Sequence, residues 1–486
     1  MSNSSLKAFL WSFLEQGGSK VVSLVVQIVL ARILSPEAFG VLAILLVVTN
    51  VADAIAQSGL GSAIIQRKTS DEVTYSTAFW LSMGIAAALF CCILVVSPAI
   101  ESFYAMPDLG GYLNVLALVV FFNSANSIQR SILQKQMDFK SLFWTSTLAA
   151  IASGVIGAGG AFAGWGVWAL VAQTISQSAA TCIVMAARVP WRPRLAFSKS
   201  EAGELLSYGW KIAFTSILNV FYTGISDLVV GRACSAEALG YYSQGRKYPM
   251  AVISMATNAI QNVMFPALAK RQESRKAFAN ATRRALVTGT FVIAPLALYC
   301  ASAAEPIVAL LLTEKWLPCV PIFQMVCVSH SVMMLTMANL RAYMALGESG
   351  LYLKLQVFKV VIGGVAICGT AILTGDIYLT ALTTCISTLF NTVVVDPACA
   401  KWVYGYSAVR QMKDIGPSIL LAAVAALVGY APTFVVGNYI ARLLLQTLAF
   451  WLVYLIGARV LRLQGLSDCV SIAQSLIPNR KAEKTK

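Results

Sequence analysis

The chain has 486 residues, of which 58% are hydrophobic and only 12% are charged. A soluble protein of this length needs far more charge to cover its surface, so a soluble globular fold is excluded. Apolar runs of about 20 residues, the length of a membrane-spanning helix, recur along the whole chain. The sequence therefore predicts an all-α integral membrane protein that crosses the bilayer many times.

Fourteen spanning helices are predicted from these runs. The first residues carry only Lys7 and show no cleavage pattern, so the first helix is expected to remain in the mature protein. In chain order the predicted helices cover residues 10–31, 39–59, 75–97, 111–132, 141–163, 166–187, 207–231, 239–264, 286–312, 319–341, 352–373, 377–397, 417–437 and 439–460.

The Lys and Arg residues of the loops are unevenly distributed between the two sides. If the N-terminus is cytoplasmic, the outer loops hold Arg32, Arg232 and Lys315, and nearly all other loop cations lie inside. The positive-inside rule then places both termini in the cytoplasm. This distribution explains the net charge of +15 without nucleic acid.

One short motif occurs twice, as ARILSPEAFG at 31–40 and GRACSAEALG at 231–240. Its Arg, Ser, Glu, Ala and Gly recur at matching positions. Six crossings separate the copies, so the chain returns to the same orientation and two parallel-repeat lobes are predicted. We expect both copies to form periplasmic turns that shape the lobes, and not to bind the cargo.

The repeat predicts a division of the chain into five segments. They are an N-lobe at 1–187, a cytoplasmic linker at 188–204, a C-lobe at 205–400, two further helices within 401–462 and a cytoplasmic tail at 463–486. In the tail, Leu466, Val470, Ala473 and Ile477 fall on one helical face. An interfacial helix and a disordered tail both remain open there.

Signatures of catalysis are not found in the sequence. The segment GGSK at 17–20 lacks the spacing of a phosphate-binding loop. The 11 cysteines lie mostly in apolar runs without a metal-type CxxC pair, and the single histidine, His330, is interpreted as a packed or pore-lining residue. A transporter is predicted, without catalytic residues, metal or cofactor.

Several charged residues fall inside predicted helices, where a charge costs several kcal/mol unless it meets water or a partner. Lys359 and Arg442 lie near helix ends, so their side chains are expected to snorkel to the headgroups. Function and snorkelling are equally weighted for Lys211. The cations predicted to bind an anionic cargo such as a diphosphate in a water-filled cavity are Lys20, Arg246, Lys247 and Lys211.

Three acids accompany these cations, namely Glu15, Asp53 and Asp227. Asp53 belongs to a polar stripe with Asn50 and Gln57 on one face of the second helix. Interhelical ion pairing and exchange of a proton or sodium ion that couples transport are both open interpretations.

A resemblance to a known family is carried by four segments. They are LARILSPEAFG at 30–40, SGLGSAIIQRK at 58–68, LGYYSQG at 239–245 and FPALAKRQ at 265–272. In this ordered set the chain resembles the polysaccharide exporter branch of the MOP superfamily, in particular Wzx-type flippases such as the colanic acid and teichuronic acid exporters. The similarity extends over essentially the whole chain.

The resemblance implies a V-shaped protein of two six-helix bundles with two additional C-terminal helices. It also implies alternating-access transfer of undecaprenyl-diphosphate-linked oligosaccharide from the cytoplasmic to the periplasmic leaflet, in exopolysaccharide or O-antigen biosynthesis. A glycan polymerase is the expected partner downstream. Related lipid II flippases use cations of helices 1 and 8, the places of Lys20 and Arg246 here, although Lys20 is a lysine where arginine is familiar.

Three other functions are weighed against this one. A multidrug antiporter of the MATE group shares the fold but should have an acidic, apolar cavity, against which the intramembrane Lys and Arg argue. A membrane polymerase or ligase for glycans normally carries a large external loop, and every external loop predicted here is short. A scaffold in a glycan assembly complex predicts that neutralising Lys20 and Arg246 leaves export intact.

Overall fold

The computed structural model describes residues 3–57, 59–67, 71–269 and 274–476. Within these ranges the regular structure is helical and contains no strand, which confirms the predicted all-α class. The chain divides into two compact units, residues 1–243 with 371–377 and residues 244–370 with 378–486. The predicted lobe and linker boundaries stay a prediction.

The first unit is built from nine helices of the described chain and the start of a tenth. They are α1 (Asn3–Ile33), α2 (Pro36–Gln57), α3 (Leu60–Gln66), α4 (Glu72–Tyr104), α5 (Leu109–Leu116), α6 (Leu118–Lys135), α7 (Phe139–Phe162), α8 (Val167–Arg188), α9 (Lys199–Ala233) and the first residues of α10 (Ala236–Ala269).

The second unit holds the rest of α10 and the helices that follow it. They are α11 (Arg275–Ser302), α12 (Ala304–Leu312), the 3-10 helix η1 (Glu314–Cys319), α13 (Val320–His330), α14 (Met333–Ala345), α15 (Ser349–Thr374), α16 (Ile377–Phe390), the π-helix η2 (Asn391–Val395), α17 (Ala400–Tyr404), α18 (Ala408–Tyr430), the 3-10 helix η3 (Ala431–Phe434), α19 (Tyr439–Val460) and α20 (Gln464–Leu476).

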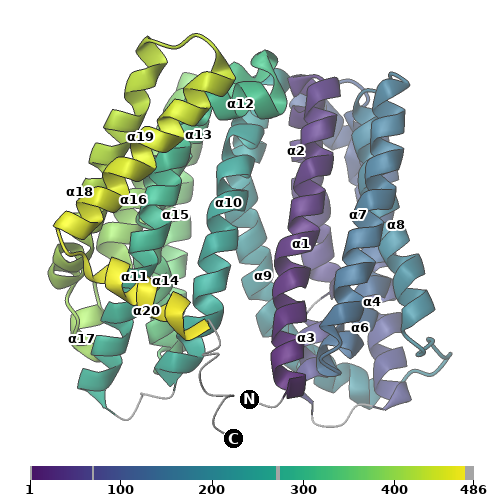
Figure 1. The fold of residues 1–486 in the computed structure, drawn as a ribbon. Coiled ribbons are helices and arrows are strands. Elements are labelled where there is room, and N and C mark those ends of the chain that lie inside the picture. Colours follow the sequence, from purple (N-terminus) through teal and green to yellow (C-terminus); the bar gives the residue numbers. More distant parts are fainter. Residues whose placement is uncertain (1–2, 58, 68–70, 270–273, 477–486) are drawn as a thin grey trace, which may run out of the picture. The chain divides into compact units, whose positions relative to one another are not determined.

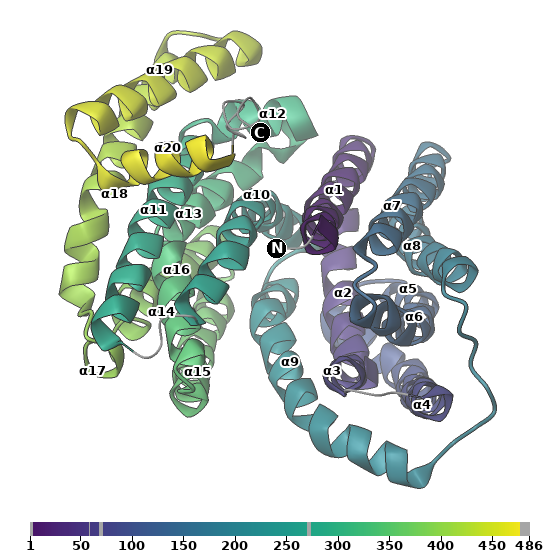
Figure 2. The ribbon, with the colours of Figure 1, turned by 60° about the horizontal axis from the view of Figure 1, so that its bottom comes forward.

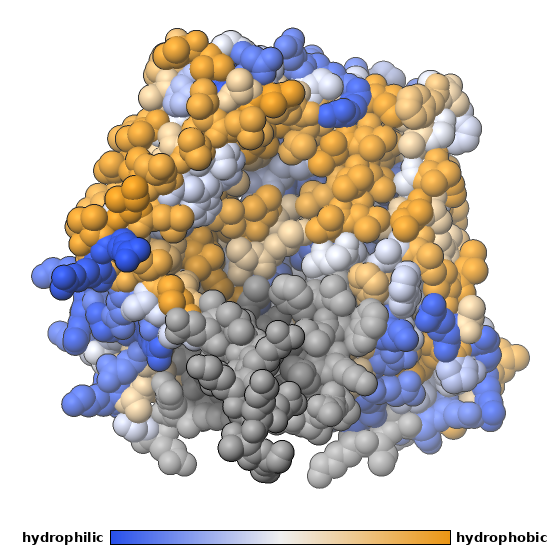
Figure 3. Space-filling model, in the orientation of Figure 1, coloured by the Kyte–Doolittle hydropathy of each residue, from blue (hydrophilic) through white to orange (hydrophobic). Residues whose placement is uncertain are grey.

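Eleven helices of the described chain are long and apolar enough to cross a membrane, or twelve if the bent pair Glu314–His330 and Met333–Ala345 forms one span. Helices occur at all fourteen predicted positions, but α1 and α10 are not among the eleven. The count of fourteen spans is therefore not confirmed. On the face shown in Figure 3, hydrophobic residues cover the middle of the helices and hydrophilic residues gather towards their ends.

In the first unit, α1 packs along α7 and α7 along α8, while α6 contacts α2, α4 and α8 (Figures 1 and 2). Small residues allow these close contacts, as is usual between membrane helices. A Cβ added at Gly18 would lie 2.8 Å from the ring of Phe143, and one at Gly157 would lie 2.7 Å from Gln173. Helices α2, α6 and α8 also contact one another pairwise and border a common interior.

The chain between α8 and α9 is hydrogen-bonded along the first half of α4. The indole Nε1 of Trp80 donates to the carbonyl of Arg194 at 2.7 Å, and the Arg194 guanidinium pairs with Glu72 at 2.5 Å. The Ser198 amide donates to Thr77 Oγ1 at 3.1 Å. This polar connection therefore fixes where α9 begins relative to α4.

The doubled motif forms two equivalent helix starts. The hydroxyl of Ser35 accepts a hydrogen bond from the Ala38 amide at 3.4 Å, and that of Ser235 accepts one from the Ala238 amide at 3.1 Å. A serine at this position caps the exposed amides of a first helical turn. The following glutamates lie in the first turns of α2 and α10, where a negative charge is favourable.

The glycines of the motif bring the two copies into direct backbone contact. A Cβ at Gly40 would overlap the carbonyl oxygen of Ala236, and a Cβ at Gly240 would overlap that of Pro36. Positions 40 and 240, and positions 36 and 236, are equivalent in the two copies. The contact is therefore reciprocal, as expected for repeats related by an approximate twofold axis.

Helix α9 continues this packing along α2. A Cβ at Gly224 would lie 2.7 Å from Val47, and one at Gly231 would lie 2.9 Å from Ile44. Because the two glycines are seven residues apart, they lie on one face of α9. The last turns of α9 and the start of α10 thus pack against the N-terminal half of α2.

In the second unit, α11 packs against α13, α14, α18 and α20, and α18 packs against α19 (Figure 2). Arg283 binds both carboxylate oxygens of Asp414, at 2.8 and 2.9 Å, and so joins α11 to α18. The amides of Asn339 and Gln411 exchange hydrogen bonds of 2.8 and 3.1 Å between α14 and α18. The two helices predicted as additional are therefore packed into this unit.

Helix α20 lies across α11 (Figures 1 and 2). Asp468 accepts two hydrogen bonds from Arg284, at 3.0 and 2.7 Å, and one from Thr288 at 3.0 Å. Close packing at Gly465 against Phe291 brings the two backbones together. Of the two interpretations of the tail, the helix is the one found for residues 464–476.

We expect Gly240→Ala to lower the free energy of unfolding by about 1–3 kcal/mol, because the new methyl group must displace the backbone of α2. Thermal unfolding of the purified protein in detergent measures this change. Gly84→Ala is the matched control, since nothing lies within 4 Å of a Cβ at that helical position. Equal unfolding midpoints for the two variants would contradict the reciprocal contact.

We expect Asp468→Ala to release α20 from α11, because Arg284 and Thr288 both lose their acceptor. Hydrogen–deuterium exchange of the amides in residues 464–471 should then become at least about tenfold faster, as expected for a lost charge-assisted hydrogen-bonding partner. Ser467→Ala, at an exposed position one residue away, should leave the exchange unchanged. Equal exchange in the two variants would refute the docking role of Asp468.

Candidate functional site

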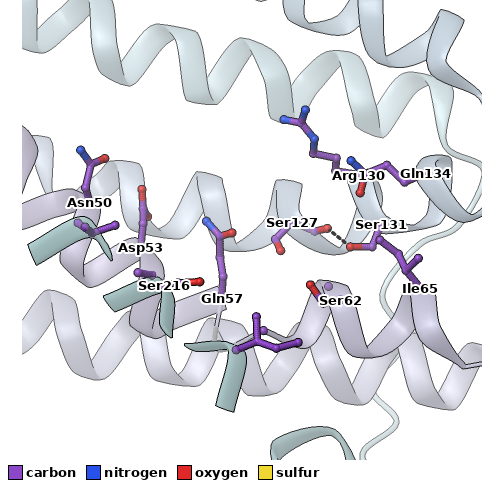
Figure 4. Close-up of a pocket in the computed structure, with 15 residues that line it drawn as sticks. Asn50, Asp53, Gln57, Ser62, Ile65, Ser127, Arg130, Ser131, Gln134 and Ser216 are labelled. Carbon is purple, nitrogen blue, oxygen red and sulfur yellow. Dashed lines mark hydrogen bonds between the residues drawn. The ribbon is translucent and has the colours of Figure 1, made fainter. Parts of the chain in front are cut away.

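The predicted polar stripe of the second helix is present on α2. Asn50, Asp53 and Gln57 project from α2 to the same side, as Figure 4 shows. Their spacing of three and four residues puts them on one helical face. The stripe borders a cavity of the first unit that is partly open to the surface, with Asn50 exposed and Asp53 and Gln57 half-buried.

A second stripe, on α6, was not predicted. Asn123, Ser127 and Arg130 lie on one face of that helix and line the same interior. Asn123 donates from Nδ2 to Asp53 Oδ2 at 2.6 Å, which joins the two stripes. Arg130 lies near the end of the predicted helix 111–132 and was counted among the cytoplasmic loop cations, but α6 continues to Lys135. The spacing of its polar residues, which matches that of the stripe on α2, was the signal that could have revealed this second stripe.

Two adjoining cavities, with volumes of about 480 and about 370 Å³, lie between these helices. The larger is bounded by α2, α3, α6 and α9, and the smaller by α2, α6 and α8. Both are lined by mainly hydrogen-bonding side chains. The residues common to both are Asn50, Asp53, Gln57, Ser127 and Arg130.

Two buried oxygen atoms at the smaller cavity have no hydrogen-bond partner among the described residues, namely Asp53 Oδ1 and Asn126 Oδ1. Asn126 is 8% exposed, and its Nδ2 donates to the Ser178 carbonyl at 3.1 Å. Leaving such an acceptor unsatisfied costs about 1–3 kcal/mol. The cavity is therefore arranged to receive a donor or a cation.

Three of the four predicted cargo-binding cations, Lys20, Arg246 and Lys247, line neither cavity. Lys20 is exposed on α1 in the first unit, and Arg246 and Lys247 are half-buried on α10 in the second. Arg246 is within electrostatic range of His330 and Cys385. A shared cationic cavity stays a prediction, and the side chain of Lys211 lies outside the described part of the structure.

The predicted acids have different surroundings. Asp53 lines both cavities and is bonded to an amide, while Asp227 is half-buried on α9 and lines neither. The side chain of Glu15 lies outside the described residues. His330 bonds through Nδ1 to the Val326 carbonyl at 2.9 Å, as a packed histidine does.

The prediction that Lys359 snorkels to the headgroups is wrong. Lys359 is 7% exposed and its Nζ contacts Asp396 Oδ1 at 2.7 Å. Thr336 donates to the other carboxylate oxygen at 2.6 Å. The carboxylate compensates the ammonium inside the second unit, so the side chain need not reach the headgroups.

The prediction that Arg442 snorkels to the headgroups is also wrong, because this side chain too has an acidic partner within the second unit. It is 8% exposed and pairs with Glu305 at 2.9 Å, joining α19 to α12. Its Nε also donates to the Val436 carbonyl at 2.9 Å. Both mispredicted cations thus bind acids distant in the sequence.

We expect Lys359→Met to destabilise the second unit by about 3–5 kcal/mol, because Asp396 would be left as an uncompensated buried charge. The double variant Lys359→Met with Asp396→Asn should recover much of that loss. Thermal unfolding of the purified variants measures both effects. Lys354→Met, at an exposed position of α15, is the control. A double variant no more stable than Lys359→Met would contradict a direct charge pair.

Comparison with known families and curated proteins gives consistent matches. A family model described as "Polysaccharide biosynthesis protein" matches residues 29–321. The succinoglycan biosynthesis transport protein ExoT of Rhizobium meliloti (strain 1021) is 23% identical over 66% of this chain and 65% of its own length. The lipopolysaccharide biosynthesis protein WzxC of Escherichia coli (strain K12) is 28% identical over 63% of each. Both matches thus cover less than two thirds of the relative.

A third relative and two solved structures extend these matches. The teichuronic acid biosynthesis protein TuaB of Bacillus subtilis (strain 168) is 24% identical over 74% of this chain and 73% of its own length. The lipid II flippase MurJ, in an inward closed conformation, aligns with a TM-score of 0.74 over 93% of this chain and 98% of that chain, at 16% identity. An inward-facing MATE family transporter of the MOP superfamily aligns with a TM-score of 0.63 over 79% and 94%, at 15% identity. The structural matches show a shared fold.

Proposed function

We propose that this chain, which belongs to the polysaccharide biosynthesis protein family, moves a lipid-linked oligosaccharide across a bacterial cytoplasmic membrane. The observation that carries the proposal is a cavity of hydrogen-bonding side chains, lined by helices long and apolar enough to cross a membrane. Polar residues inside a membrane protein commonly mark the path of a substrate. The transport role named for one relative and the flippase fold shared with another support the same function.

The cargo is proposed to be an undecaprenyl-diphosphate-linked oligosaccharide. Lys20, Arg246, Lys247 and Lys211 are the side chains proposed to bind its diphosphate, since Arg and Lys are the usual partners of phosphate oxygens. The glycan would enter between the lobes from the cytoplasmic side while the polyprenyl tail stays in lipid. Rocking of the lobes would then expose the glycan to the periplasm.

The direction of transport is proposed to come from one of two sources. A proton or sodium gradient could act through Asp53, whose Oδ1 has no hydrogen-bond partner among the described residues. Glu15 and Asp227 are further candidates for this coupling. Alternatively, a glycan polymerase removes the product and shifts the equilibrium between the two open states. With both termini in the cytoplasm, Gly40 and Gly240 would lie at the periplasmic end.

A multidrug antiporter is the main rival function, because transporters of that kind share the fold. Such a protein should bind organic cations, whereas the exposed Lys20 and the half-buried Arg246 and Lys247 favour an anion. A glycan polymerase or ligase is a second rival function, and a scaffold is a third. Each predicts a different phenotype when the cations are neutralised.

Complementation tests the proposal in a strain from which the coding sequence of this chain has been deleted. Lys20→Ala and Arg246→Ala should each lower surface glycan about tenfold or more at equal membrane levels, because each loses a charged partner of the diphosphate. Lys354→Ala, an exposed lysine of α15, should restore wild-type glycan.

Two outcomes distinguish the scaffold and the polymerase from the flippase, and a third locates the ion coupling. Full export by both cation variants would contradict the binding assignment and favour a scaffold. Accumulation of unpolymerised glycan on the periplasmic face of cells lacking the chain would indicate a polymerase. Loss of gradient-dependent export in Asp53→Asn, with Lys354→Ala unaffected, would locate coupling at Asp53.

A further inference from the structure

We infer that the two cavities of the first unit bind hydroxyl groups of the transported glycan. This site is distinct from the cations proposed to bind the diphosphate. This inference rests on the proposed function and assigns one part of its substrate to one site. The lining contains one acid, Asp53, and one cation, Arg130, among many amides and hydroxyls. That composition suits a neutral ligand with many hydroxyl groups.

The amides of Asn50 and Gln57 are the groups best placed to recognise such a ligand. Both line both cavities and project to the same side of α2 (Figure 4). Hydrogen bonds from these two side chains to other described residues are absent, unlike the bond that ties Asn123 to Asp53. Each amide offers two donors and an acceptor, the combination that matches a pair of neighbouring sugar hydroxyls.

The buried acceptors of the smaller cavity favour a ligand that donates hydrogen bonds. Asp53 Oδ1 and Asn126 Oδ1 both lack a donor among the described residues. A diphosphate offers almost only acceptor oxygens and would be repelled by the Asp53 carboxylate. A sugar hydroxyl is both donor and acceptor, so it satisfies these oxygens and the neighbouring amides together.

The size and shape of the cavities agree with a sugar ring. Their volumes of about 480 and about 370 Å³ fall within the ~300–1,000 Å³ of small-molecule sites. Ile65 and Ile212 give the larger cavity an apolar wall beside its polar groups, which can contact the C–H face of a ring. Because the cavities adjoin, they can hold two consecutive sugars.

A monovalent cation is the competing occupant, since Asp53 Oδ1 and Asn126 Oδ1 are hard oxygen ligands. A sodium ion would use these two oxygens but not the donor groups of Asn50, Gln57 and Arg130. The hydroxyl ligand uses both kinds of group, and the observations therefore favour it. Asn50 and Gln57 are consequently the positions that separate the two occupants.

The test is equilibrium binding by microscale thermophoresis with the purified full-length protein in detergent. Two probes are used: the lipid-linked oligosaccharide extracted from the source bacterium, and undecaprenyl diphosphate without sugar. Wild-type protein should bind the glycosylated lipid more tightly. Asn50→Ala and Gln57→Ala should each weaken binding of the glycosylated lipid about fivefold and leave binding of the sugar-free lipid unchanged.

Matched variants make the result specific. Asn219→Ala removes an exposed amide of α9 that lines neither cavity and should bind both lipids as wild type does. Arg246→Ala should weaken both lipids equally, because it is assigned to the diphosphate. Failure of wild-type protein to bind either lipid would refute the proposed function itself.

Two other results would overturn the inference while leaving the proposed function in place. One is unchanged preference for the glycosylated lipid in Asn50→Ala and Gln57→Ala. The other is thermal stabilisation of wild-type protein by sodium chloride over choline chloride that Asp53→Asn abolishes, together with wild-type glycan binding in that variant. The second result would make the cavity a cation site.

Discussion

The reciprocal contact of Gly40 and Gly240 fixes helix α2, and the interior of the first unit depends on α2. Backbones can approach this closely only where neither residue carries a Cβ. The packing of Gly224 and Gly231 continues the same contact along α9. With one face of α2 held in this way, an adjacent face presents Asn50, Asp53 and Gln57 to the cavity. One helix thereby supports both the repeat architecture and the candidate site.

The polar groups of both units fall into two classes with different consequences. In pairs such as Lys359–Asp396 and Arg442–Glu305, the opposite charges compensate each other and join helices within the second unit. At the cavity of the first unit, by contrast, Asp53 Oδ1 and Asn126 Oδ1 lack partners among the described residues. In an apolar surrounding, the paired charges stabilise the packing of helices. The unpaired oxygen atoms are favourable only if a ligand or water donates a hydrogen bond to them.

Local patterns in the sequence were sufficient for much of the fold. Apolar runs located helices at all fourteen predicted positions, and the spacing of Asn50, Asp53 and Gln57 identified one wall of the cavity. The serine of each repeat copy caps a helix, a role that its place before an apolar run indicates although it was not predicted. These features depend on residues within a few turns of one another, which a single sequence contains.

The remaining features depend on contacts between distant segments. Asp396 lies 37 residues after Lys359, and nothing in the local pattern links them. Arg130 was assigned to a loop because a positive charge near a predicted helix end is typical of cytoplasmic loops. Because of that assignment, the polar stripe on α6 that faces the one on α2 was not predicted. Direct contact between the two repeat copies likewise follows from tertiary packing and not from the motif itself.

The central claim is that this chain transfers a lipid-linked oligosaccharide between leaflets. The most direct measurement reconstitutes the purified protein in vesicles with that lipid in both leaflets. A membrane-impermeant glycosidase or oxidant is then added outside. We expect the inner-leaflet fraction to become accessible over time with wild-type protein, and far more slowly with Arg246→Ala or in protein-free vesicles. Equal accessibility in protein-free vesicles and in those with wild-type protein would contradict the claim.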